Sequence, residues 1–121
     1  MKACMSLGDL IDALKRCPQS LPVRFDEEEQ TPYAGQFYSY RGYYEDIALE
    51  LSASPSTVAG LLQRAEAAVG QTFEGWKGGD YTMDRDSRLW VVSEQRYASG
   101  IRPVTLINEG NQIVIERIQV E

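Results

Sequence analysis

The stretch Val104-Thr-Leu-Ile-Asn-Glu-Gly-Asn-Gln-Ile-Val-Ile115 decides the fold class of this chain. Two short apolar runs flank Asn108-Glu-Gly-Asn111, whose composition is typical of the turn in a β-hairpin. Ile118 and Val120 extend the second run with alternating spacing. Because a hairpin pairs its strands antiparallel, we expect the sheet of this protein to be antiparallel or mixed.

Three further strands are predicted upstream of this hairpin. Leu89–Val92 is a short continuous apolar run, as a buried strand requires, and Leu21–Phe25 forms another short candidate. Apolar and polar residues alternate from Tyr43 to Leu51, which indicates a strand with one buried face. The sheet therefore has about five strands.

Two helices complete the pattern. Ser6 and Asp9 have the spacing of a capping box, and this helix is expected to end near Cys17, before Pro18. Ser54-Pro55 predicts the start of a second helix, which Gly70 ends. The prediction is a single domain over residues 1–121: an α+β fold with two helices packed on one face of a mixed or antiparallel sheet.

The composition restricts location and partners. Hydrophobic residues make up 43% of the 121 residues, which is enough for a core. No apolar run approaches the roughly 20 residues of a membrane helix, and the N-terminus lacks a long apolar signal region, so we expect a cytoplasmic protein without membrane contact. The net charge of −6 argues against nucleic acid as the main partner.

No cofactor, metal or catalytic group is predicted. The chain has no histidine, and its two cysteines lie at opposite ends of the first helix, too far apart for a disulfide. Asp80, Asp84 and Asp86 lack the spacing of a calcium loop, so a solvated turn is favoured there.

Five of the seven tyrosines lie in Tyr33-Ala-Gly-Gln-Phe-Tyr-Ser-Tyr-Arg-Gly-Tyr-Tyr44. Pro32 and the two glycines favour irregular backbone up to Gly42. The tyrosines are compatible with strand packing. They are equally compatible with recognition, because tyrosine combines a flat ring with a polar tip and Arg41 can grip a phosphate or a carboxylate.

Gly75-Trp-Lys-Gly-Gly-Asp-Tyr-Thr82 is the second candidate segment. In a structural interpretation the glycines supply positive φ and Trp76 covers the core. In a functional interpretation the backbone N–H groups of Gly78 and Gly79 form an anion nest, Lys77 adds charge and Trp76 stacks on a ring. The spacing is not that of a Walker loop.

The chain resembles a family of small uncharacterised proteins from tailed phages and prophages. The similarity covers residues 6 to 92. It rests on Leu7-Gly-Asp-Leu-Ile-Asp-Ala-Leu14, Pro18-Gln19, Phe25-Asp26, Ser39-Tyr-Arg-Gly-Tyr-Tyr-Glu-Asp-Ile-Ala-Leu49, Thr57-Val58 opening a helix, and Ala68-Val-Gly-Gln-Thr-Phe-Glu-Gly-Trp-Lys-Gly-Gly-Asp-Tyr-Thr-Met83. Residues 27–37 and the strands after Pro103 depart from the family pattern. The resemblance implies a phage origin and a place in the host cell cytoplasm, and it implies no activity.

Small phage accessory proteins of this size often block host defence, and by this analogy the expected function is non-enzymatic counter-defence, with sequestration of a small nucleotide-like anionic ligand. The candidate ligand-binding residues are Tyr38, Tyr40, Arg41, Gly42, Tyr43, Trp76, Lys77, Gly78, Gly79 and Tyr81. The alternative is an anti-CRISPR-like inhibitor that docks on a host defence protein through an acidic, tyrosine-rich face that includes Asp26-Glu-Glu-Glu29. A homodimer is expected, because a small domain has little depth for a ligand and the C-terminal strands offer an apolar edge.

Overall fold

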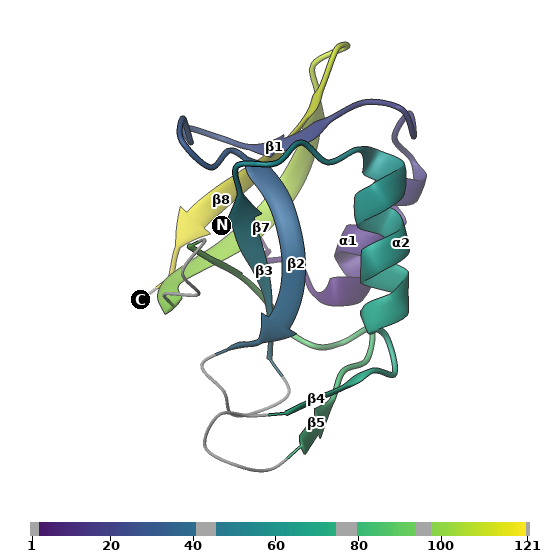
Figure 1. Ribbon diagram of the computed structural model, residues 1–121, viewed down its shortest axis with the longest axis vertical. Helices are drawn as coiled ribbons and strands as arrows, with labels where there is room; N and C mark the ends of the chain where they lie inside the picture. Colours follow the sequence, from purple (N-terminus) through teal and green to yellow (C-terminus); the bar gives the residue numbers. More distant parts are fainter. Residues whose placement is uncertain (1–2, 41–45, 75–79, 94–97, 121) are drawn as a thin grey trace.

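Six strands form a closed barrel, and both helices lie together on one side of it (Figure 1). The computed structural model describes residues 3–40, 46–74, 80–93 and 98–120. The elements are α1 Leu7–Lys15, β1 Val23–Phe25, β2 Tyr33–Ser39, β3 Ile47–Ser52, α2 Val58–Ala68, β4 Thr72–Glu74, β5 Asp80–Thr82, β6 Leu89–Val92, β7 Ala98–Asn108 and β8 Ile113–Gln119. The predicted α+β class is confirmed, with six barrel strands instead of about five.

The barrel is a mixed sheet in the order β1-β2-β3-β6-β7-β8. Neighbouring strands run antiparallel except in two pairs, since β3 and β6 are parallel and β1 closes the barrel by pairing parallel with β8. Parallel neighbours require a long crossover. The crossover from β3 to β6 contains α2 and a separate two-stranded sheet of β4 and β5.

The C-terminal hairpin confirms the sequence prediction and extends it. β7 and β8 pair antiparallel from Asn108 and Ile113 to Ile101 and Gln119. In the turn, Gly110 adopts a φ of +93°, which favours glycine, and its N–H donates to Asn108 Oδ1 at 2.8 Å.

The first helix begins as predicted. Asp9 N–H donates to Ser6 Oγ at 3.1 Å, and Ser6 N–H donates back to Asp9 Oδ2 at 2.9 Å, so the capping box is complete. The buried face of α1 consists of Leu7, Gly8, Leu10, Ile11 and Leu14. This spacing places one apolar stripe on the core.

The predicted start of the second helix at Ser54-Pro55 is wrong. Thr57 is the N-cap, and its hydroxyl accepts a hydrogen bond from Gly60 N–H at 3.1 Å. The residues before it are held in extended form, because Val23 N–H donates to Ser56 O at 2.8 Å and Thr57 forms a β-bridge with Pro22. At the other end Gly70, with a φ of +82°, follows the helix as predicted.

The expectation of irregular backbone up to Gly42 is also wrong, because Tyr33–Ser39 forms β2. Its pairing with β3 shifts between Ala34 and Phe37, so a bulge breaks the alternation that would have revealed a strand. Arg64 of α2 satisfies the carbonyls there, donating to Gly35 O at 3.0 Å and Ala34 O at 3.1 Å. Burial lowers the pKa of the Arg64 guanidinium.

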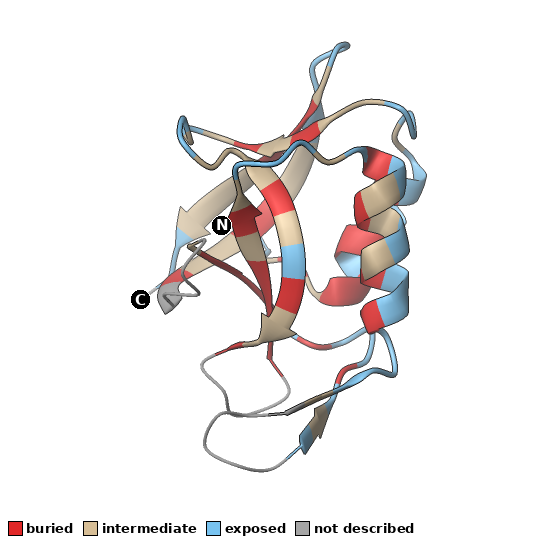
Figure 2. Cartoon of the chain, in the orientation of Figure 1, coloured by how far each residue is buried: buried red, intermediate tan, exposed pale blue. Residues whose placement is uncertain are grey.

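The core fills the barrel and continues under the helices (Figure 2). Side chains of β3 and β6 alternate across the barrel wall, with Leu49 and Val91 inside. A second, smaller cluster consists of Tyr40, Ala48, Trp90 and Val92. We call it the outer-face cluster, because strand alternation places Ala48, Trp90 and Val92 opposite the barrel interior and Tyr40 stacks on Trp90. Apolar burial on both faces explains the continuous run Leu89–Val92.

Candidate functional site

The predicted ligand-binding residues fall on two segments. Tyr38, Tyr40 and Tyr81 are described by the structure. The other seven, Arg41, Gly42, Tyr43, Trp76, Lys77, Gly78 and Gly79, lie outside the described residues. The site is therefore built from what flanks these two segments.

The flanks of both segments lie at the same end of the barrel. β2 leads into segment 41–45, and β4 and β5 bracket segment 75–79. β2 and β4 are in contact, and the two-stranded sheet extends from the end of the barrel at which β2 finishes and β3 starts (Figure 1). The fold thus brings together the edges of two segments that are far apart in sequence.

The base of segment 41–45 is closed by a backbone hydrogen bond. Tyr40 N–H donates to Asp46 O at 2.9 Å. The Tyr40 ring stacks on Trp90 with ring centroids 4.4 Å apart and an interplanar angle of 4°. Its hydroxyl accepts from Gly100 N–H at 3.2 Å, and the residue is 4% exposed. Tyr40 therefore belongs to the packing of the outer-face cluster, and its ring is already engaged.

Asp46 fixes the other side of this base. Trp90 Nε1–H donates to Asp46 Oδ2 at 3.0 Å. Arg88 donates from Nε to Asp46 Oδ1 at 3.1 Å and forms an ion pair from Nη2 to Oδ2 at 3.1 Å. A buried carboxylate with several donors is well satisfied, so its position is strongly determined.

Arg102 connects this cluster to the start of α1. Its guanidinium lies over the Trp90 ring, 5.3 Å from the centroid. It donates from Nε to Leu89 O at 3.0 Å and from Nη2 to Met5 O at 2.9 Å. The sequence interpretation missed Asp46, Trp90 and Arg102. An aromatic residue in the middle of an otherwise aliphatic buried strand was the available signal, since a buried indole N–H needs an acceptor.

Two neighbours of Tyr40 differ in their exposure and hydrogen bonding. Tyr38 is half-buried on the outer face, paired across the strands with Ala48. Ser39 pairs with Ile47, so its side chain points to the inner face. The Ser39 hydroxyl oxygen is buried and has no hydrogen-bond partner among the residues that the structure describes. Buried hydroxyl groups are usually hydrogen-bonded, so this one, a single residue from the closed base, is available to bind a hydrogen-bonding group of a ligand.

On the second segment, Tyr81 has a structural contact. It pairs with Phe73 across β4 and β5, and both side chains are half-buried against the main core. Beside them, the hydroxyls of Thr72 and Thr82 share a hydrogen bond at 2.9 Å. This small sheet therefore holds the two ends of segment 75–79 together on a packed base.

One carboxylate of the acidic segment after β1, that of Asp26, forms an ion pair within the molecule. Arg117 donates from Nε to Asp26 Oδ1 at 2.8 Å, and its Nη2 donates to Asp26 O. The Arg117 guanidinium also lies over the Phe25 ring. Glu27 and Glu29 are exposed, and Glu27 has a positive φ of 53°. Asp26 thus ties β1 to β8.

Asp84 and Asp86 form a turn between β5 and β6, as predicted, but the prediction is wrong for Asp80, which begins β5 and pairs with Glu74. Asp86 N–H donates to Asp84 Oδ1 at 2.8 Å, and Asp84 N–H donates to Ser87 Oγ at 3.0 Å. Arg85 leaves this turn to pair with Asp12 at 2.8 Å. In the described ranges, no three Cys, Asp or Glu residues are grouped as metal ligands would be. None of the helices in those ranges has the length and apolar character needed to cross a bilayer.

Comparison of the chain with protein-family models, with curated proteins and with solved structures finds no match in any of the three.

Proposed function

We propose that the protein is a non-enzymatic, phage-type counter-defence protein that sequesters a small nucleotide-like anionic ligand in the host cell cytoplasm. The ligand would bind at the barrel end where segments 41–45 and 75–79 begin and end. Arg41 and Lys77 would contact the phosphate, and Gly78 and Gly79 would let the backbone approach it. Because the Tyr40 ring already stacks on Trp90, Tyr43 and Trp76 would be the residues that stack on the nucleobase of the ligand.

The observation that carries this proposal is the fixed base of segment 41–45. Five residues are held between Tyr40 and Asp46, which are joined by their backbones and bound separately to Trp90. The two residues that flank the segment are thus fixed before a ligand binds, and groups that are already fixed lose little conformational freedom on binding. The contact of β2 with β4 supports a site shared by both segments.

Ser39 is a candidate additional contact. Within the described part of the chain its buried hydroxyl lacks a hydrogen-bond partner, and Ser39 immediately precedes Tyr40 at this base. A phosphate or sugar oxygen reaching the end of the barrel would supply one. This would also explain why an unsatisfied polar atom is kept there at a stability cost.

The first experiment asks whether the purified protein carries a ligand. The protein is purified under native conditions and denatured, and the released small molecules are identified by mass spectrometry. A nucleotide in near-stoichiometric amount is expected. If none is released, a panel of nucleoside mono-, di- and triphosphates is tested by thermal shift, and no stabilisation by any of them would contradict the proposal.

Variants then localise the site. Arg41→Ala and Lys77→Ala should each weaken nucleotide binding by about tenfold or more, as expected for loss of a charge-assisted hydrogen bond, and leave the melting temperature almost unchanged. Lys15→Ala is the matched control, because it removes one exposed cation on α1, where Lys15 pairs with Glu66. Equal weakening by the control would indicate a nonspecific charge effect.

The docking alternative has less support from the described residues. The Asp26 carboxylate is bound to Arg117, so part of the acidic segment stabilises the fold. Capture of a host protein complex that survives substitution of Arg41, together with no released nucleotide, would favour this alternative.

A homodimer remains part of the proposal, on the ground that two copies would enclose a ligand better than one small domain. The apolar-edge argument does not support it. Ile113 and Ile115 are fully buried, and β8 pairs with both β7 and β1. Light scattering at micromolar concentration tests the dimer, and a mass near 13.6 kDa would refute it.

A further inference from the structure

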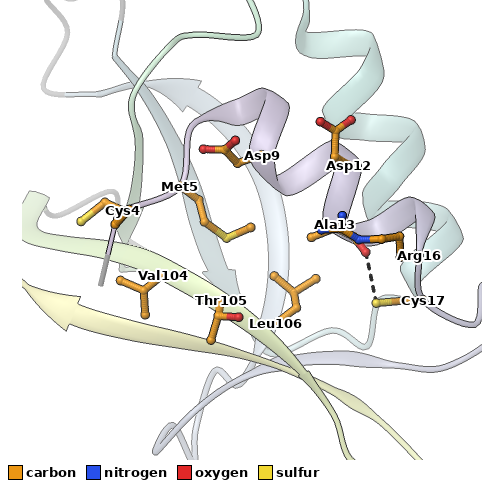
Figure 3. Close-up of a pocket in the computed structure, with 11 residues that line it drawn as sticks. Cys4, Met5, Asp9, Asp12, Ala13, Arg16, Cys17, Val104, Thr105 and Leu106 are labelled. Carbon is orange, nitrogen blue, oxygen red and sulfur yellow. Dashed lines mark hydrogen bonds between the residues drawn. The ribbon is translucent and has the colours of Figure 1, made fainter. Parts of the chain in front are cut away.

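A groove of about 560 Å³ runs between α1 and β7, on elements that the proposed nucleotide site does not use (Figure 3). It is lined by Ala3, Cys4, Met5, Asp9, Asp12, Ala13, Arg16, Cys17, Val104, Thr105 and Leu106. Its volume is in the range of sites for small organic ligands. Cys4 and Cys17 lie at opposite ends of it, so the groove is elongated along the helix.

The walls of this groove are fixed by hydrogen bonds. Met5 N–H donates to Pro103 O at 2.9 Å, and Arg102 Nη2 donates to Met5 O at 2.9 Å. Leu7 N–H donates to Ser87 O at 3.0 Å, which holds the first turn of α1 against the barrel. The space between helix and strand is therefore a preformed feature of the fold.

The lining of the groove is amphipathic. Met5 and Val104 line the groove but are only 7% and 9% exposed, so its apolar surface comes mainly from half-buried Ala13 and Leu106. The charged groups come from the exposed face of α1. Such a lining suits a ligand that has an apolar body and a polar head.

The ion pairs of the charged lining residues indicate the sign of the charge on the polar head of the ligand. The Asp9 carboxylate accepts from Ser6 N–H at 2.9 Å, and the Asp12 carboxylate is paired with Arg85 at 2.8 Å. Among the residues that the structure describes, Arg16 makes no ion pair. Arg16 also lies close enough to Cys17 to lower its pKa, although burial has the larger effect and raises it. Asp9 keeps its negative charge but lies in the first turn of α1, whereas Arg16 is the C-cap, so the uncompensated charge at the Cys17 end is positive.

We propose that this groove is a second binding site, for a small amphipathic monoanion such as a medium-chain carboxylate. The apolar body lies on Ala13 and Leu106, and the anionic head pairs with Arg16. A guanidinium binds a carboxylate through two parallel hydrogen bonds, which gives the head a defined place. The proposal is independent of nucleotide binding at the end of the barrel.

The two thiols provide a reporter built into the groove. Both cysteines are free and partly exposed. A ligand along the groove would cover Cys4 and slow its reaction with the neutral reagent iodoacetamide. Cys17 is the slower thiol, because burial raises its pKa and its Sγ–H donates to Ala13 O at 3.3 Å.

The experiment measures the alkylation rate of Cys4 in the full-length protein by peptide mass spectrometry, with and without sodium decanoate. At a decanoate concentration ten times the dissociation constant, the rate should fall about tenfold, as the unoccupied fraction does. Decyltrimethylammonium, with the same chain and the opposite charge, should not protect. No protection by decanoate, or equal protection by the cation, would overturn the proposal.

Three variants test the assignment. Arg16→Gln should weaken protection by decanoate at least about tenfold. Lys15→Gln is its matched control, removing one cation from the same turn on the side that faces Glu66, and should leave protection unchanged. Ala13→Leu fills the groove with a good helix former and should abolish protection while circular dichroism stays native. Wild-type protection in both Arg16→Gln and Ala13→Leu would place decanoate elsewhere and refute the site.

Discussion

Substitution of Asp46 tests the network that holds the base of segment 41–45. Asp46→Ala removes the acceptor of Trp90 Nε1–H, and the Trp90 residue is 7% exposed. A buried donor left without a partner costs about 1–3 kcal/mol. The side chain of Arg88 is 61% exposed, so its ion pair with Asp46 adds little. We expect a loss of about 2 kcal/mol in the free energy of unfolding.

A loss of this size is readily measured. It corresponds to a fall in melting temperature of roughly 6–12 °C for a domain of this length. Asp46→Asn keeps an oxygen that can accept from Trp90 and should cost less than about 1 kcal/mol. Arg88→Gln should cost no more than about 0.5 kcal/mol, as exposed ion pairs do. The order of the three variants therefore separates the buried hydrogen bond from the exposed ion pair.

The pairing itself is measured by a double-mutant cycle of Asp46→Ala and Trp90→Phe. Urea unfolding is monitored by far-UV circular dichroism, because the substitution of Trp90 changes the fluorescence. A coupling free energy of at least about 1 kcal/mol is expected for groups in direct contact. A coupling near zero, or an Asp46→Ala variant within about 0.5 kcal/mol of wild type, would refute the structural role assigned to Asp46.

Three further predictions concern other parts of the chain. Glu27→Gly should stabilise the protein by about 0.5 kcal/mol, because glycine removes the backbone strain of the positive φ of 53° and this gain exceeds the cost of added freedom in the unfolded chain. Glu29→Gly is the control without this gain, and urea unfolding measures the stability of both variants. Asp26→Ala should lose about 2 kcal/mol by the same assay, since it leaves Arg117, whose side chain is 13% exposed, without its carboxylate; a loss below about 0.5 kcal/mol would contradict that role. Burial raises the pKa of the Cys17 thiol, so folding favours the protonated form. The contribution of this thiol to stability is therefore present below its ordinary pKa of 9.0 and is lost as pH rises through the pKa of the folded state. Cys17→Ser should flatten this loss of stability in thermal melts between pH 8 and 10, about one unit either side of the ordinary pKa.

The sequence predicted elements whose signals are local. The capping box of α1 and the glycine-containing turn between β7 and β8 each lie within a few residues, and both are confirmed. The run Leu89–Val92 was identified as a strand because its composition alone is decisive. Where a few neighbouring residues determine the conformation, the sequence pattern is sufficient.

The missed features depend on contacts distant in sequence. β2 was hidden by its bulge, whose carbonyls are satisfied by Arg64, 29 and 30 residues away. The start of α2 predicted at Ser54-Pro55 was misplaced because Thr57 is held by its pairing with Pro22, whereas the motif Thr57-Val58 indicates the observed start. The Asp46–Trp90 hydrogen bond spans 44 residues. Neither residue type nor periodicity specifies which distant strands pair, so these contacts could not be predicted.

Strand pairing also explains why the flanks of the two candidate segments lie at the same end of the barrel. β3 and β6 are parallel neighbours in which Ile47 pairs with Leu89, so both strands start at the same end of the barrel. The chain must therefore return to that end after β3, and α2 followed by the two-stranded sheet makes the return. β2 runs antiparallel to β3 and finishes at this end with Ser39 paired to Ile47. Segment 41–45 precedes β3 and segment 75–79 precedes β5, whose partner β4 contacts β2, so the described flanks of both segments lie at this end of the barrel.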